Sequence, residues 1–148
     1  MSKHLLLLTM LLFSFSHSSA SEGEAKALER LAVTTDMLIS AGDEMVDEPF
    51  SGLLVLNDTL SLDMNLNSTY SYQFIIWTNS TFNFVDFWLT NPQGICPSAD
   101  LSDHTTLTIM PDSVETGIWQ LEMELLEGAY SDSAYYAAAV FRRPRSLH

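Results

Sequence analysis

The stretch Ile109–Leu125 reads IMPDSVETGIWQLEMEL, and its second half alternates strictly between apolar and polar residues. Every second residue from Trp119 to Leu125 is apolar, and the residues between them are Gln or Glu. Because successive side chains of a strand point to opposite faces, the pattern predicts a strand with one face on a core and Trp119 within that core. Pro111-Asp112 and Gly117 precede the run and indicate turns.

The same period of two recurs along the chain from Phe50 onward. Apolar and polar residues alternate in LSLDMNLN (60–67), whereas both faces of TYSYQFIIW (69–77) carry apolar residues, which predicts a central strand. Short strands are also expected in FNFVDFWLT (82–90) and Thr105–Met110, and a type I turn at Asn91-Pro92-Gln93-Gly94. SAYYAAAVFRR (133–143) is expected as the last strand, although its alanines leave a helix possible. The pattern predicts an all-β chain, an antiparallel β-sandwich of about seven strands over residues 50–141.

The chain begins with the features of a secretory signal peptide. One Lys precedes an apolar run from Leu5 to Phe15, and small residues follow it up to Ala20. The run is too short to span a bilayer of about 30 Å. We therefore expect residues 1–20 to be cleaved and the protein to be secreted, extracellular and not inserted in a membrane afterwards.

Residues 21–49 have a different pattern from the sandwich. Ala25, Leu28, Leu31 and Ala32 recur at spacings of three and four, which predicts a short amphipathic helix. Met37-Leu38-Ile39 is expected as a brief edge strand, and GDEMVDEP (42–49) as an acidic connector closed by Pro49. At the other end, residues 142–148 are expected to form a basic tail.

Charge and cysteine content restrict the partners. The net charge of −13, with only six Lys and Arg, argues against nucleic acid, because binding to phosphates requires many cationic side chains. Cys96 is the only cysteine, so the chain has no disulfide within itself. A free buried thiol and an intermolecular disulfide both stay open for this residue.

The residue types needed for catalysis are scarce. Once residues 1–20 are removed, His104 and His148 are the remaining histidines, which excludes a His-Glu-x-x-His zinc site. A Ser-His-Asp triad would need His104 beside Asp100 and Asp103, in what we interpret as a solvated polar loop. The acidic residues of the connector match no defined calcium loop. We expect no enzymatic activity, no cofactor and no metal.

Two features indicate surface modification or recognition. Sequons occur at Asn57, Asn67 and Asn79, each beside an expected strand end, so these residues are candidate glycosylation sites. Trp88 and Tyr136 could form an aromatic surface for carbohydrate, although aromatic residues on alternating strands more often belong to the core.

Three segments carry a resemblance to a known family. FIIWTN (74–79), FVDFWLTNPQG (84–94) and IMPDSVETGIWQLEMEL (109–125) together resemble the β-sandwich that follows the von Willebrand factor type A domain in calcium-activated chloride channel regulators. A hemicentin-like module is similar. The matching positions, which the resemblance implies are structural, are Trp77, Pro92, Gly94, Pro111, Gly117 and Trp119.

The resemblance implies a module without the chemistry of the whole family. Residues 21–49 resemble the tail of a type A domain, but the protease and metal-ion adhesion motifs of the family do not occur in this sequence. We therefore expect a secreted, non-catalytic glycoprotein that acts as an extracellular interaction or structural module, with an extracellular or membrane protein as its partner. The alternatives are a carbohydrate-binding sandwich and a truncated family member or partial gene product without independent activity.

Overall fold

The structure of the chain is a computed structural model that describes residues 22–95, 106–109 and 115–145. Its elements are α2 (Glu22–Ser40), β1 (Glu44–Val55), β2 (Thr59–Leu66), β3 (Tyr70–Thr78), β4 (Phe84–Thr90), β5 (Thr106–Ile109), β6 (Gly117–Glu127) and β7 (Ser133–Pro144). The signal peptide expected at residues 1–20 lies outside the described residues, as do Cys96, Asp100, Asp103, His104, Pro111 and His148.

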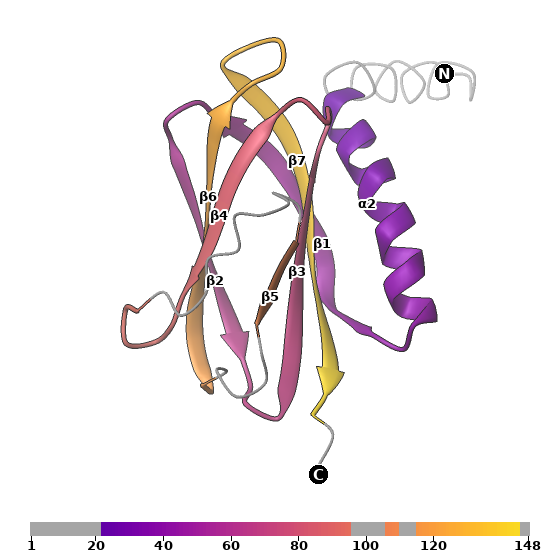
Figure 1. Cartoon of the computed structure of the whole chain (residues 1–148), viewed down its shortest axis with the longest axis vertical. Helices are drawn as coiled ribbons and strands as arrows, with labels where there is room; N and C mark the ends of the chain where they lie inside the picture. Colours follow the sequence, from indigo (N-terminus) through magenta and orange to yellow (C-terminus); the bar gives the residue numbers. More distant parts are fainter. Residues whose placement is uncertain (1–21, 96–105, 110–114, 146–148) are drawn as a thin grey trace, which may run out of the picture.

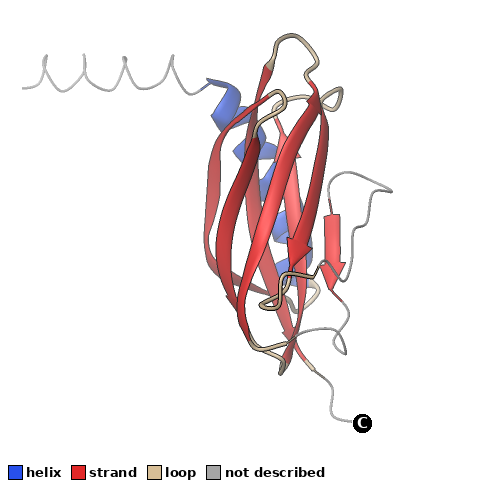
Figure 2. Ribbon diagram, turned by 90° about the vertical axis from the view of Figure 1, so that its left-hand side faces the viewer, coloured by secondary structure: helices blue, strands red, loops and turns tan. Residues whose placement is uncertain are grey.

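The seven described strands form two sheets packed face to face (Figure 1). One sheet has the order β1-β7-β3-β5 and the other the order β2-β6-β4, and every neighbouring pair is antiparallel. Helix α2 lies on the outer face of the four-stranded sheet, so that it stands behind the strands in Figure 2. The predicted antiparallel β-sandwich is confirmed, with the helix as a third layer.

The core between the sheets is built on the alternating run of β6. Trp119, Leu121, Met123 and Leu125 are all buried, as the sequence predicts. The Trp119 indole Nε1 donates a hydrogen bond to the Glu115 carbonyl oxygen at 2.8 Å, so its one polar atom is satisfied inside the core. Gly117 begins the strand with φ of 149°, and a Cβ there would lie 2.9 Å from Cγ of Pro92. Pro92 and Gly117, two of the positions on which the family resemblance rests, therefore lie close together.

Strand β3 is central, as predicted, because it pairs with β7 on one side and β5 on the other. Its two apolar faces have different partners. Phe74 and Ile76 face the core between the sheets, whereas Ile75 and Trp77 join the cluster under α2. The predicted turn at Asn91–Gly94 is also present, with the Gly94 N–H donating to the Asn91 carbonyl at 2.9 Å.

The helix differs from the prediction in length and in the face that it buries. The brief strand expected at residues 37–39 is the last part of α2, because Leu38 packs into the cluster under the helix. The buried residues of the helix are Ala27 and Leu31. Of the other residues that we expected on the buried face, Leu28 is 37% exposed, and Ala25 and Ala32 are exposed as well. The small Ala27 side chain lets the helix lie close to the alanines of β7.

The acidic connector expected up to Pro49 is mostly strand. β1 begins at Glu44 and pairs with β7, with a register shift between Val46 and Phe50. Asp47 within this bulge has φ of 61°, and Pro49 is tolerated because β1 is an edge strand. The sandwich therefore starts before Phe50.

The basic tail expected from residue 142 is also partly strand. Arg142 and Arg143 belong to β7. Arg142 forms an ion pair at 3.0 Å with Glu44, the first residue of β1, and Arg143 forms one at 3.1 Å with Asp43, which precedes β1. Arg143 also donates to the carbonyl of Ala41 at the end of α2. The two charged segments, far apart in sequence, hold the helix end, β1 and β7 together.

We predict that Trp119→Ala destabilises the fold by about 3–5 kcal/mol, because it leaves a large cavity in a closely packed core. Urea denaturation followed by far-ultraviolet circular dichroism measures this loss. Trp88→Ala is the control, since Trp88 is only half-buried and lies outside the core. Equal losses for the two variants would contradict the assignment of Trp119 as the centre of the core.

The hydrogen bond from Arg142 lowers the pKa of the Glu44 carboxyl below its ordinary value of 4.5. A carboxyl whose pKa is lowered in the folded state stabilises the fold above its unfolded pKa and loses that contribution as the pH falls through the folded pKa. We therefore predict that Glu44→Gln lowers the urea midpoint at pH 7 and that the difference disappears in acid. The ion pair would not be the cause if the urea midpoint of Glu44→Gln stayed equally far below that of the unmodified protein at low pH. The same holds if Glu29→Gln on α2 lowered the midpoint as much.

Candidate functional site

The residues proposed for metal binding or catalysis do not converge in the part of the chain that the structure describes. Within residues 22–95, 106–109 and 115–145, no group of three or more His, Cys, Asp and Glu is placed to hold a metal ion. Asp43 and Glu44 are engaged by arginines, and Asp47 and Glu48 are exposed at the bulge of β1.

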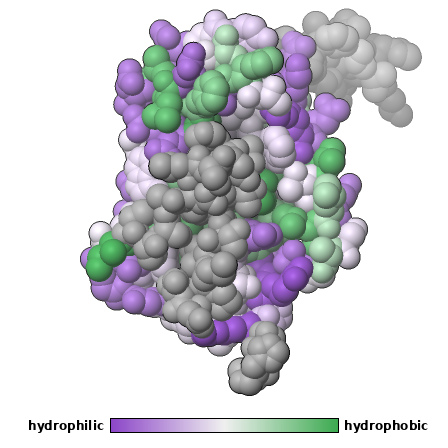
Figure 3. Space-filling view, in the orientation of Figure 1, coloured by the Kyte–Doolittle hydropathy of each residue, from purple (hydrophilic) through white to green (hydrophobic). Residues whose placement is uncertain are grey.

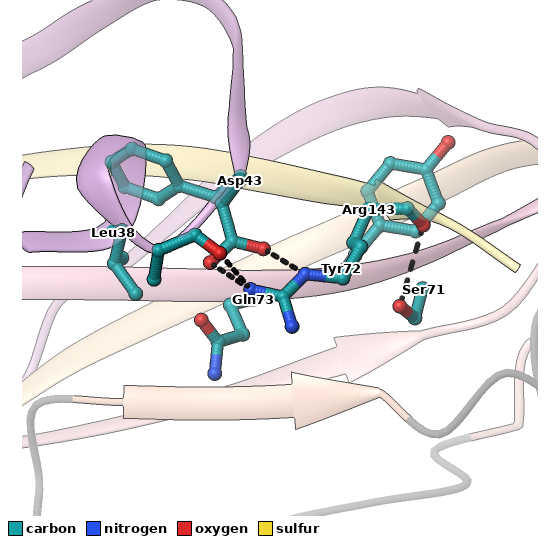
Figure 4. Close-up of a pocket in the computed structure, with 8 residues that line it drawn as sticks. Leu38, Asp43, Ser71, Tyr72, Gln73 and Arg143 are labelled. Atoms are coloured by element: carbon teal, nitrogen blue, oxygen red, sulfur yellow. Dashed lines mark hydrogen bonds and ion pairs between the residues drawn. The ribbon is translucent and has the colours of Figure 1, made fainter. Parts of the chain in front are cut away.

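A cleft of about 280 Å³ lies where the end of α2 meets β3 and β7 (Figure 4). Leu38 and Phe141 are among its apolar lining residues, and the Arg143 guanidinium points at Asp43 across it. Nearly all of the Asp43 side chain is buried, and its two carboxylate oxygens each accept a hydrogen bond from Arg143. The ion pair thus joins the end of the helix to the sheet, and the cleft lies at the boundary between them.

The outer face of the three-stranded sheet is the more distinctive surface. In the register of these strands, Asp86 lies opposite Glu124, and Trp88 lies opposite Glu122. On the other side of β6, Gln120 lies opposite Asp63 and donates to its carboxylate at 3.2 Å. We call this surface the acidic face and define it by the outward residues Asp63, Asp86, Trp88, Ile118, Glu122 and Glu124.

Glu122 fixes the aromatic ring at the centre of the acidic face. Its Oε2 accepts a hydrogen bond from the Trp88 indole Nε1 at 2.6 Å and a second from the Thr90 hydroxyl at 3.3 Å. All three side chains are half-buried. The arrangement holds a carboxylate beside an indole ring on an open sheet surface.

The charges of the molecule are distributed unevenly between its two sheets. Strands β2, β4 and β6, described along their whole length, contain five Asp and Glu residues and no Lys or Arg: Asp63, Asp86, Glu122, Glu124 and Glu127. The Lys and Arg residues of the described chain lie instead on α2 or at the end of β7 and just after it: Lys26, Arg30, Arg142, Arg143 and Arg145.

Exposed apolar side chains lie at both ends of the acidic face. Ile118 lies near one end of the sheet and is 58% exposed, while Phe84 and Leu126 lie near the other end and are 46% and 51% exposed. Figure 3 shows apolar atoms gathered at the upper end of the molecule, where the β3–β4 and β6–β7 connections lie. Acidic and apolar groups therefore occupy the same surface.

The two aromatic residues expected to bind carbohydrate do not lie together. Tyr136 is 5% exposed and packs edge-on against Phe50 inside the sandwich, and its burial raises its pKa. It has no free ring face for a sugar. Trp88 alone of the pair reaches the acidic face.

The three sequons differ in their surroundings. Asn57 and Asn67 are exposed in the turns that flank β2. Asn79 is half-buried, and its Oδ1 accepts hydrogen bonds from the Tyr135 backbone N–H and the Asn83 side-chain amide, both at 3.2 Å. The first two side chains are thus more accessible than the third.

Of the positions on which the family resemblance rests, those that the structure describes have roles in packing or in turns. Trp77 packs under α2, where Arg30 lies 4.6 Å from its ring centre and its Nε1 donates to Thr34 at 2.9 Å. Gly94 has φ of 81° in the turn after β4. The roles of Arg30 and Thr34 are not apparent from the sequence, because nothing in the helix itself indicates which strand it will meet.

In the described part of the chain, α2 does not have the length and apolar character needed to cross a membrane. A comparison of the sequence with protein-family models and with curated proteins finds no match. The resemblance to the chloride channel regulators therefore stays a prediction.

Proposed function

We propose that this protein is an exported, non-catalytic β-sandwich glycoprotein that acts as an interaction module, as in the resemblance to the module of chloride channel regulators. The observation that carries the proposal is the acidic face, a sheet surface with several carboxylates and no Lys or Arg in its three strands. Its partner is a protein with a basic surface.

The electrostatics of the acidic face support a cationic partner. Asp86 and Glu124 lie directly opposite one another, and like charges in this arrangement destabilise a sheet. Cationic groups of a partner would relieve this repulsion and would be steered to the surface by its potential.

Trp88 and the exposed apolar residues add binding area to this surface. Aromatic residues are enriched in protein interfaces, and a Lys or Arg side chain is attracted to the face of an indole ring. Since Glu122 already accepts the indole N–H, the ring orientation is set before binding. A preorganised side chain loses less conformational entropy in a complex.

Carbohydrate binding is the second candidate, and the placement of Trp88 on an open sheet surface beside carboxylates favours it. With Tyr136 in the core, the aromatic platform is reduced to one ring. A glycan array tests this candidate. Binding of a glycan that is lost in Trp88→Ala and retained in Asp86→Asn would favour a sugar over a basic protein as the ligand of this surface.

We predict that expression in a eukaryotic secretory host yields a protein in the medium that begins near Ser21 and carries glycans on Asn57 and Asn67. Intact mass before and after glycosidase treatment measures this. Asn57→Gln and Asn67→Gln should each remove one glycan, whereas Asn79→Gln should change the mass less, because Asn79 is half-buried. Retention of the chain in the cell without glycans would contradict export.

We predict that a synthetic oligo-arginine peptide binds the secreted protein through the acidic face. The triple variant Asp86→Asn/Glu122→Gln/Glu124→Gln should weaken binding by about tenfold or more, equivalent to ~1.4 kcal/mol. Isothermal titration calorimetry at several salt concentrations measures the affinity. The control, Glu22→Gln/Glu29→Gln/Asp36→Asn on α2, has the same change in net charge. An equal loss in both variants would show attraction to net charge alone and would contradict a defined surface.

A further inference from the structure

The outer edge of β1 is an unusual strand edge. Among the strands that the structure describes, β1 pairs with β7 alone, so the other edge of the strand has no strand partner. Residues 50–55 read FSGLLV and carry no charge. Proteins normally protect such edges with charges, prolines or bulges. Here Asp47, Glu48 and Pro49 protect only the preceding segment, and the protection ends at Phe50.

Two hollows lie along the inner side of this edge. One of about 250 Å³ is lined by apolar residues that include Phe50, Met64 and Val140, and by the acidic residues Asp47, Glu48 and Asp63. The other, of about 200 Å³, is lined by Leu54, Leu60 and Asp58 among others. Phe50 and Leu54 are four residues apart, about 13 Å along a strand, so the hollows are spaced to receive alternate side chains of one extended segment.

The other side of the same edge also exposes apolar groups. Leu53 and Val55 are 47% and 42% exposed on the outer face of β1. The Ser51 hydroxyl donates a hydrogen bond to the Glu24 carboxylate of α2. Leu28 lies one turn further along the same side of the helix. An added strand would therefore find apolar surface above and below its plane.

We propose that the edge of β1 from Phe50 to Val55 binds an extended segment of another protein as an added strand. Main-chain hydrogen bonds to the free edge would supply affinity, and apolar side chains in the two hollows would supply specificity. The segment carries a Lys or Arg at the end that meets Asp47 and Glu48, with its aliphatic stem in the first hollow and its charge against the carboxylates. This edge belongs to the other sheet from the acidic face, and Asp63 is the residue that both surfaces share. The proposal goes beyond the function assigned to the acidic face.

Charge argues for a different protein as the occupant and against a second copy of this chain. A second copy of β1 would bring Glu44, Asp47 and Glu48 to the interface and no Lys or Arg, so it offers no cation to the carboxylates of this edge. A segment with a basic end meets the same carboxylates with the opposite sign.

The test is selection from a displayed library of random decapeptides against the full secreted protein. We expect enriched peptides with alternating apolar residues and a Lys or Arg near one end. Binding of a selected peptide should fall about tenfold or more in Leu53→Lys and in Val55→Lys, and in Asp47→Asn. Val33→Lys and Asp36→Asn, at exposed positions of α2, are the matched controls. Thermal unfolding of each variant checks that it is folded.

Amide hydrogen exchange separates strand addition from other modes of binding. Alternate amides within residues 50–55 should become protected when the peptide binds, and a proline at the centre of the peptide should abolish binding. The absence of enriched peptides, binding indifferent to Leu53→Lys, or tolerance of the central proline would overturn the proposal. A concentration-dependent dimer that protects the same amides would also overturn it and assign the edge to a second copy. Loss of peptide binding in the triple variant of the acidic face would instead place the peptide on that face.

Discussion

The contact between α2 and the alanines of β7 is the constraint on which the rest of the structure depends. β7 is apolar on both faces, with Ala138 and Val140 in the core between the sheets and Ala137 and Ala139 under the helix. Small side chains at these positions allow a helix and a second sheet to pack closely on the same strand. Because β7 also pairs with both β1 and β3, its position fixes the four-stranded sheet and the edge that β1 presents.

The sequence predicts the strands better than it predicts the helix and the ends. Period-two alternation follows from the geometry of a single strand, so Trp119 and its neighbours could be assigned to the core without knowledge of any partner strand. The helix face could not be assigned in this way, because Leu28 and Ala27 are both apolar and only the shape of β7 decides which is buried. The ion pairs of Asp43 and Glu44 likewise depend on residues about a hundred positions away.

The candidate surfaces depend on strand register in the same way. Asp86 and Trp88 lie in a different segment of the sequence from Glu122, and the three residues form one surface only because β4 and β6 are neighbours in a particular register. Register also separates residues that the sequence suggests could act together. Trp88 and Tyr136 are both aromatic residues of expected strands, but they lie in different sheets. Because side chains alternate along a strand, Trp88 points outward and Tyr136 points into the core.

The arginines at the end of β7 do not make that end of the molecule positive. Arg142 and Arg143 are paired with Glu44 and Asp43, and Asp47 and Glu48 lie further along β1. Near an anionic surface, such as a bilayer rich in acidic lipids, the net charge of −13 repels the protein, and the paired arginines do not offset that repulsion. The charge pattern therefore disfavours direct contact of this protein with acidic lipid.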